Sequence, residues 1–233
     1  MADSVEDIRP RTMARIAGFL YLGFIIATAM ANVVGRMGII VDGNAASTAA
    51  NIIAKGARFR IGFVSDLLSA LLFLLTAWAL YTLLKRVNSN LALLFLLFNM
   101  CGVAMQCFSM ILLYAALPLV SGGGFLDAFT TDQLNGQAMF FLALYKAGFT
   151  GAQLFYSAWT LPLGYLVFKS GFLPKALGIM LMLDCLAIVI WCFQFFFLPG
   201  NPAVGCPCWV VSFIAEFSLT LWLVIKGIKK ECA

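Results

Sequence analysis

The sequence predicts an all-α fold: a polytopic integral membrane protein of six transmembrane helices, with a short interfacial helix between the first two. Hydrophobic residues make up 63% of the 233 residues and charged residues only 11%, whereas a soluble domain is about half apolar and a quarter charged. The mean hydropathy is +1.00. The apolar residues fall into six long runs, so we expect a single membrane domain over 1–233 with no separate soluble part.

The N-terminal part is predicted to hold a tail, two spans and the interfacial helix. Residues 1–13 are polar and contain Pro10, which predicts a loose cytoplasmic tail before the first span, 14–34. Basic residues ahead of an apolar run that ends in Ala-Met-Ala also fit a cleavable secretory signal, and this alternative stays open. Within 35–58, apolar residues recur at helical spacing, which predicts a short helix in the membrane interface before the second span, 59–84.

Turn residues separate the remaining four spans. A tight Asn-Ser-Asn turn precedes the third span, and Pro118 with the glycine run after it is expected to end that helix and open a flexible external loop up to Gly136. The fourth span is longer than a bilayer needs, and Pro162 is expected to kink it. A basic hairpin tip and a Pro-Gly-Asn-Pro turn introduce the last two spans. The four spans are predicted over residues 91–117, 138–168, 176–198 and 204–226.

Lysine and arginine residues predict the orientation. Ten of them flank the spans on one side of the membrane, and four lie on the other side, all in or beside the first connection. The positive-inside rule then places both termini in the cytoplasm of a cell membrane, inner or plasma. The ten are Arg9, Arg11, Arg15, Lys85, Arg86, Lys169, Lys175, Lys226, Lys229 and Lys230, and the four are Arg36, Lys55, Arg58 and Arg60.

Composition also excludes several functions. The net charge of +5 does not indicate a nucleic-acid partner, because the basic residues gather at span ends rather than on one phosphate-binding face. The chain has no histidine, which removes Ser-His and Cys-His catalysis. Cys206 and Cys208 are the candidate ligands for a soft metal, but with no histidine to complete a usual site the sequence predicts no metal and no cofactor. Whether the protein is an enzyme stays open, with a non-enzymatic role favoured.

Ionisable side chains inside the predicted spans are the best functional pointers, because a charge in the hydrocarbon is costly. At a rise of 1.5 Å per residue, Asp66, Lys146 and Glu216 each lie about 12 Å from the outer face, and Asp184 lies about 6 Å deeper. Lys146 is expected to pair with Asp66, with Glu216 or with both. Three acids against one base leave excess negative charge, which a proton or a cation would neutralise. The four residues are therefore a candidate substrate- or ion-binding site.

Two functions fit this pattern. In the first, the protein is a small transporter or permease-like protein whose buried polar centre is coupled to a proton or a cation. In the second, it is a non-catalytic membrane module that binds a lipid, an apolar ligand or a partner protein, and the buried charges form only an interhelical clamp. The lipid bilayer is the expected partner in both.

Short motifs indicate a family. These motifs are the run from Arg15 to Gly18, Leu80-Tyr81 in the second span, Gly164-Tyr165-Leu166 in the fourth, and above all the Lys-Ser-Gly-Phe-Leu-Pro turn over 169–174. With them the chain resembles the bacterial integral-membrane family catalogued as domain of unknown function 4386. The resemblance implies a helical bacterial membrane protein and carries no activity with it.

Overall fold

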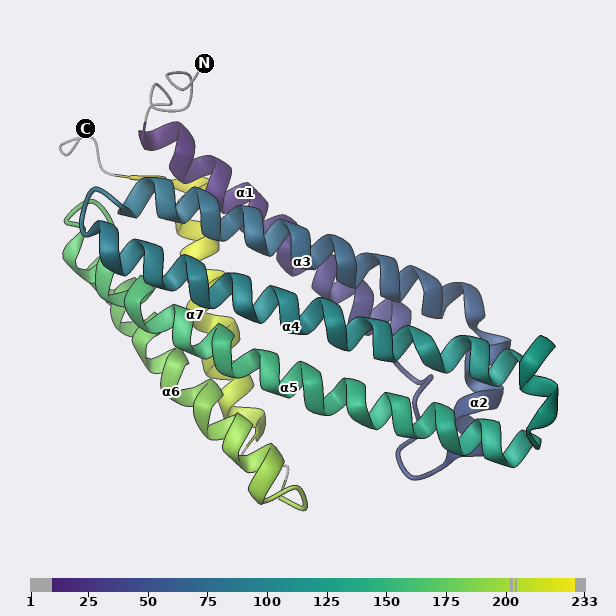
Figure 1. Cartoon of the computed structure of the whole chain (residues 1–233). Coiled ribbons are helices and arrows are strands. Elements are labelled where there is room, and N and C mark those ends of the chain that lie inside the picture. Colours follow the sequence, from purple (N-terminus) through teal and green to yellow (C-terminus); the bar gives the residue numbers. More distant parts are fainter. Residues whose placement is uncertain (1–9, 202, 204, 229–233) are drawn as a thin grey trace. The chain divides into compact units, whose positions relative to one another are not determined.

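A computed structural model describes residues 10–201, 203 and 205–228. Every regular element within these residues is a helix (Figure 1). The predicted tail up to residue 9, the end of the C-terminal basic cluster at 229–230, and the predicted start of the sixth span at residue 204 lie outside the described residues. In chain order the elements are α1 (Pro10–Ala29), the π-helical η1 (Met30–Arg36), α2 (Ala45–Ala54), α3 (Gly56–Leu84), α4 (Ser89–Ser121), the 3-10 helix η2 (Gly124–Ala128), α5 (Thr131–Lys169), α6 (Lys175–Phe197) and α7 (Gly205–Ile225).

Five helices in the described part of the chain are long and apolar enough to cross a membrane: α1 together with η1, α3, α4, α6 and α7. The chain is therefore a helical membrane protein. The 39-residue helix α5 is long enough to span but mixes glutamine, glycine, serine and threonine with its apolar residues. A sixth span formed by α5 stays a prediction, as does the side on which the termini lie.

The N-terminal boundaries differ from the predicted ones. Residues 10–13 were expected in the loose tail, but α1 begins at Pro10, a residue whose fixed φ and missing N–H suit the first turn of a helix. The first span was expected to end at residue 34, and it continues through η1 to Arg36. The Asn32 side chain supports this end of the helix, since its Nδ2 donates to Thr28 O at 2.9 Å.

The long external loop predicted from Pro118 to Gly136 is wrong. Helix α4 includes Pro118 and ends at Ser121, followed by Gly122 with a φ of +67°. A glycine in this left-handed conformation is the usual stop of a helix, so it is Gly122 and not the proline that ends α4. Helix α5 then begins at Thr131, because Thr130 and Gln133 bond each other's backbone N–H in a capping box (3.3 and 2.9 Å).

The short helix predicted between the first two spans is confirmed as α2. The Asn44 side chain caps it by accepting from Ser47 N at 2.9 Å. One face of α2 is buried, and Ile52 on that face belongs to a core cluster with Ile39 and Phe59. Its position in the membrane interface stays a prediction.

The chain packs as two compact units. Unit 1 comprises Met1–Gly23, Leu72–Val103 and Thr150–Ala233, and unit 2 comprises Phe24–Leu71 and Ala104–Phe149. Helices α1, α3, α4 and α5 contribute residues to both units.

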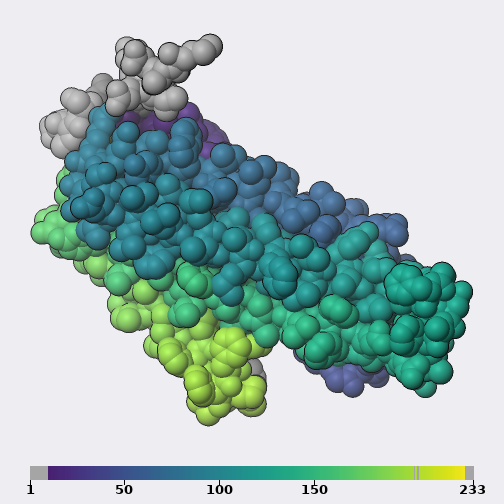
Figure 2. Space-filling view, in the orientation of Figure 1, coloured from purple at the N-terminus to yellow at the C-terminus, as the bar shows by residue number. Residues whose placement is uncertain are grey.

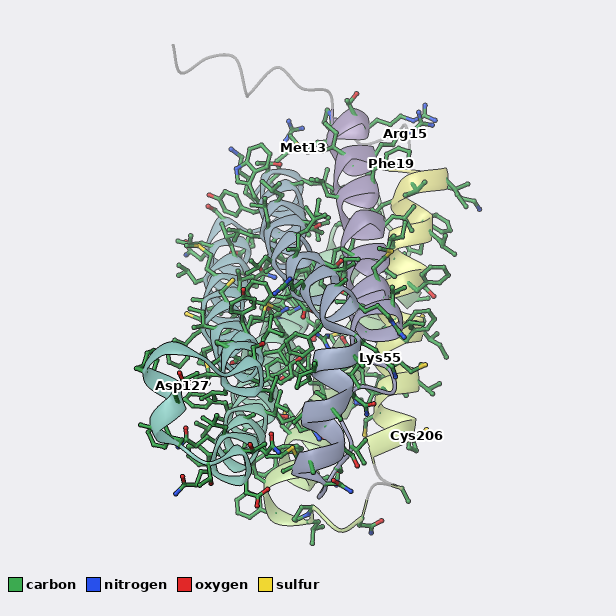
Figure 3. All side chains as sticks on the ribbon, turned by 90° about the vertical axis from the view of Figure 1, so that its right-hand side faces the viewer. Met13, Arg15, Phe19, Lys55, Asp127 and Cys206 are labelled. Atoms are coloured by element: carbon green, nitrogen blue, oxygen red, sulfur yellow. The ribbon has the colours of Figure 1, made fainter. Side chains whose placement is uncertain are left out.

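Unit 1 is built on close helix contacts. Helices α5 and α6 meet at Gly164 and Gly178, where a Cβ on Gly178 would lie 2.5 Å from Gly164 O. The first turn of α1 lies beside the residues that follow α7, since a Cβ on Gly227 would lie 3.6 Å from Arg11 Cγ. The other end of α7, where Cys206 lies, is at the opposite end of this unit (Figure 3). Glycines therefore let α5 and α6 approach backbone to backbone.

Unit 2 has a comparable contact between η1 and α3. A Cβ on Gly35 would lie 2.3 Å from the Cα of Gly62, so only glycine fits there. Helix α4, which contributes to the face shown in Figure 2, exposes large apolar side chains in both units. They include Phe108 and Ile111 in unit 2, and Leu93, Leu97 and Met100 in unit 1. Such a surface is suited to lipid.

Candidate functional site

The four charged residues predicted to share one polar centre belong to different units. Asp66 and Lys146 are in unit 2, and Asp184 and Glu216 are in unit 1. Within each unit, the charged residues interact with side chains of that same unit. The sequence did not predict these interactions, and they change the interpretation of the site.

Asp66 pairs with Arg36 in unit 2. The Arg36 guanidinium donates to both carboxylate oxygens of Asp66, with Nη2 to Oδ1 at 3.2 Å. The Asp66 side chain is buried, at 4% exposed, and that of Arg36 is partly buried, at 11% exposed. Nη2 also donates to Asn32 Oδ1 at 2.9 Å, and the guanidinium carbon lies 5.8 Å from the Tyr145 ring centroid. Arg36 and Asp66 thus satisfy each other, so this pair acts as a clamp between η1 and α3.

Lys146 of α5 forms an ion pair with Asp42, in the connection between η1 and α2. The two side chains are 41% and 81% exposed. The expected pairing of Lys146 with Asp66 is therefore not what unit 2 shows. The pair instead joins α5 to the first connection.

Asp184 of α6 and Glu216 of α7 come together in unit 1, where they interact electrostatically. Asp184 is 1% exposed, and Ser212 of α7 donates a hydrogen bond to its carboxyl group. Glu216 is partly buried and interacts with the hydroxyl of Tyr21 on α1. Ser212 and Glu216 lie four residues apart, so both face α6 from one side of α7. We call these four residues the carboxyl pair site.

Asp184 and Glu216 lie in the middle of their helices, where the described part of unit 1 has no lysine or arginine. Within the described part of unit 1, every lysine and arginine lies at a helix end or in a turn. In addition, Asp184 Oδ1 is buried and has no hydrogen-bond partner among the described residues. Two neighbouring carboxyl groups without a protein cation need a proton or a metal cation to offset their charge.

Aromatic side chains pack beside the site. The Tyr21 ring lies 6.4 Å from that of Trp159, which also contacts Phe73 at 4.9 Å and Phe95 at 6.0 Å between centroids. Trp159 is fully buried, and its Nε1 has no partner among the described residues. The same holds for both amide atoms of Asn99, one turn beyond Phe95 on α4. A buried polar group left unpaired costs about 1–3 kcal/mol, so these atoms mark a place for water or a ligand.

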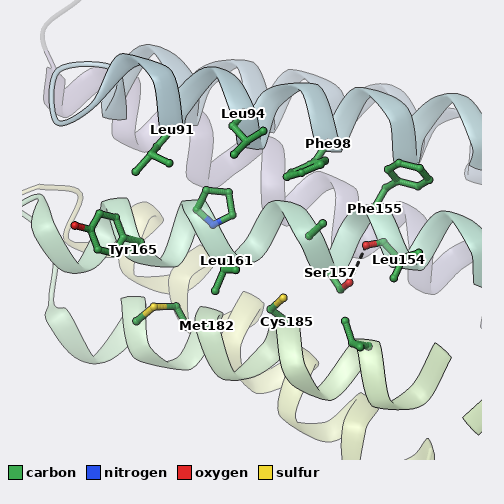
Figure 4. Close-up of a pocket in the computed structure, with 13 residues that line it drawn as sticks. Leu91, Leu94, Phe98, Leu154, Phe155, Ser157, Leu161, Tyr165, Met182 and Cys185 are labelled. Atoms are coloured by element: carbon green, nitrogen blue, oxygen red, sulfur yellow. Dashed lines mark hydrogen bonds between the residues drawn. The ribbon is translucent and has the colours of Figure 1, made fainter. Parts of the chain in front are cut away.

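A groove lies between α4, α5 and α6 of unit 1 (Figure 4). It has a volume of about 730 Å³ and an almost wholly apolar lining. Its lining includes Leu91, Phe98, Leu161, Tyr165, Met182 and Cys185. Cys185 neighbours Asp184 in the sequence, but the groove holds no charged side chain.

The two cysteines considered as metal ligands differ in exposure: Cys206 is exposed and Cys208 is buried. Across the described residues, no three histidine, cysteine, aspartate or glutamate side chains gather as a metal site would require.

Sequence reasoning missed Arg36, Asp42, Tyr21 and Ser212 as partners. Arg36 was counted as a residue of the polar connection, although its spacing of four from Asn32 would have supported a longer helix. Ser212 had a signal too, since it lies one turn before Glu216. Tyr21 had none, because a tyrosine in an apolar run is typical of any membrane helix.

Neither the curated proteins nor the solved structures include a match to this chain. A family match covers residues 16–227, which is nearly the whole chain. It agrees with the resemblance drawn from the sequence motifs. The protein belongs to the family described as Domain of unknown function (DUF4386).

Proposed function

We propose that this protein is a small transporter-like membrane protein in which Asp184 and Glu216 bind the coupling proton or a monovalent cation. The observation that carries the proposal is the carboxyl pair itself: two interacting acids on adjacent helices, with hydroxyl partners and, among the described residues of unit 1, no lysine or arginine in the middle of a helix beside them. Ionisable groups placed in this way within membrane helices are typical of ion and proton pathways. Asp66 and Lys146, each in an ion pair of its own, then have structural roles.

The proposal includes six spans, with α5 as the sixth, and both termini in the cytoplasm of the cell membrane. The closeness of Arg11 and Gly227 supports termini on one side. Within unit 1, the basic turns before α4 and α6 lie at the end where α1 begins and α7 ends (Figure 1), which supports the asymmetry on which the orientation rests.

A carbodiimide labelling experiment tests the site without knowledge of the substrate. Hydrophobic carbodiimides react with protonated carboxyl groups in a membrane, so one adduct is expected on a peptide that contains Asp184 or Glu216. Both Asp184→Asn and Glu216→Gln should reduce the labelling. Asp127→Asn, which alters an exposed acid in η2, should leave it unchanged. If sodium or potassium protects the site, the ligand is a cation rather than a proton.

Transport is tested in proteoliposomes with a pH-sensitive dye inside. Proton movement on addition of a panel of small solutes should occur with the wild type and be lost in Glu216→Gln. Labelling without any solute-driven flux would contradict the transporter. It would favour the non-catalytic membrane module, in which the carboxyl pair only holds α6 to α7.

A further inference from the structure

The apolar groove of unit 1 has the length of one leaflet. Its lining runs along α5 from Leu154 to Tyr165, and the eleven residue steps between them cover about 16 Å. Half of a hydrocarbon core of about 30 Å is nearly the same length. The lining reaches Leu91 near the start of α4 and Tyr165 near the end of α5, so one end of the groove lies toward the turns before α4 and α6 (Figure 4).

An apolar lining alone selects no ligand in a membrane. A lipid tail is as apolar as the leucine side chains of the groove, so moving the tail from bulk lipid into the groove gains little. Selectivity must come from the end of the groove where a headgroup would lie. The charges at that end therefore decide which lipid binds.

That end is basic. The Lys169 Nζ lies 5.9 Å from the ring centroid of Tyr165, a groove residue, and Lys175 stands at the start of α6, which forms one wall. Lys85 and Arg86 occupy the turn before α4, which forms another wall. All four side chains are exposed, and none takes part in an ion pair within the described residues. The segments 85–91 and 165–182 contain no acidic residue.

We propose that the groove binds one acyl chain of an anionic phospholipid, with the lipid phosphate held by Lys169 and Lys175. The charge complementarity argues for an anionic headgroup, and the length of the groove argues for a chain of a single leaflet. Basic pockets between membrane helices are a known mode of headgroup recognition. The site is separate from the carboxyl pair, so the proposal does not depend on transport.

The headgroup contact is tested in nanodiscs that contain equal amounts of phosphatidylglycerol and phosphatidylcholine with identical acyl chains. The ratio of the two lipids retained by the gently extracted protein is measured by mass spectrometry. We expect phosphatidylglycerol to be enriched on the wild type. In Lys169→Gln/Lys175→Gln the enrichment should fall by about fivefold for each lysine, the equivalent of about 1 kcal/mol.

Lys226→Gln is the matched control. Lys226 is also an exposed lysine of unit 1 and lies 4.5 Å from the Trp222 ring centroid, but neither residue lines the groove. This variant should keep the wild-type enrichment. An equal loss in Lys226→Gln would mean that surface charge in general attracts the lipid, and would overturn the site.

The acyl-chain contact is tested by filling the groove. Ala158 lines it, and Ala158→Phe should abolish retention of both lipids at this site. Ala143→Phe, on an exposed position of α5 outside the lining, should have no effect. Unchanged retention in Ala158→Phe would overturn the proposal, as would displacement of the bound lipid by water-soluble glycerol phosphate, since the headgroup alone would then account for binding.

Discussion

Replacing Arg36 by methionine tests whether the buried ion pair of unit 2 is a structural clamp. The substitution keeps much of the side-chain volume but leaves the Asp66 carboxylate, only 4% exposed, without its cation. Breaking a buried pair in this way costs about 3–5 kcal/mol, because an uncompensated charge stays buried. For a chain of this length, each kcal/mol corresponds to a shift of about 2–4 °C in Tm, so the expected fall is roughly 6–20 °C.

The other ion pair of unit 2 provides the control. Lys146 and Asp42 are 41% and 81% exposed, and pairs of that kind contribute about 0–1 kcal/mol. Lys146→Met should therefore lower Tm by a few degrees at most. Both variants are measured by thermal unfolding, followed by circular dichroism in the same detergent.

A double variant shows whether the ion pair serves only to join η1 to α3 or whether folding needs the charges themselves. Arg36→Met/Asp66→Leu replaces both charges by apolar side chains of similar size, so it should recover most of the stability lost in Arg36→Met. The reasoning is refuted if Arg36→Met costs no more than Lys146→Met, or if the double variant is as unstable as the sum of its two single changes.

Three further predictions concern packing and topology. Gly178→Leu should prevent α5 and α6 from packing, because even a Cβ there would lie 2.5 Å from a carbonyl oxygen of α5. The yield of folded protein, measured by size-exclusion chromatography, should fall sharply. Gly200→Leu is the control and should keep the wild-type yield, because a Cβ at Gly200 would have nothing within 4 Å. Asn44→Ala should lower the free energy of unfolding by about 1 kcal/mol through the lost cap of α2, measured by denaturant titration. In a variant without native cysteines, an impermeant thiol reagent applied to intact cells should label a cysteine at Gly123 and not one at Gly171; the reverse pattern would invert the proposed orientation.

Much of the fold could be predicted because hydropathy and turn chemistry are local. The starts and ends of α3, α6 and α7 agree with the predicted spans to within a few residues, and α2 was predicted from its apolar spacing alone. The errors occurred where a local signal was overruled. Pro118 was taken as a helix stop, but it removes only one backbone hydrogen bond from α4, and the helix continues to the glycine that ends it.

The candidate site could be predicted only in part. The order of apolar and polar residues put Asp66, Asp184 and Glu216 within predicted spans, and each lies in a helix long and apolar enough to cross a membrane. The 1.5 Å rise per residue predicts the depth of each residue. It gives neither the rotation of a helix about its axis nor the identity of its neighbours. Asp66 therefore received Lys146 as its expected partner, whereas Arg36, at the end of a helix longer than predicted, is the residue that binds it.

By itself the sequence determined that this protein is helical, that it lies in a membrane and which segments form its helices, because those properties depend on the order of apolar and polar residues along the chain. Only the tertiary structure decided which charges meet. It paired Asp66 with Arg36 and Lys146 with Asp42, and it brought Asp184 to Glu216. The physical reason is that side-chain partners depend on helix rotation and lateral packing, which arise from contacts between segments far apart in the sequence.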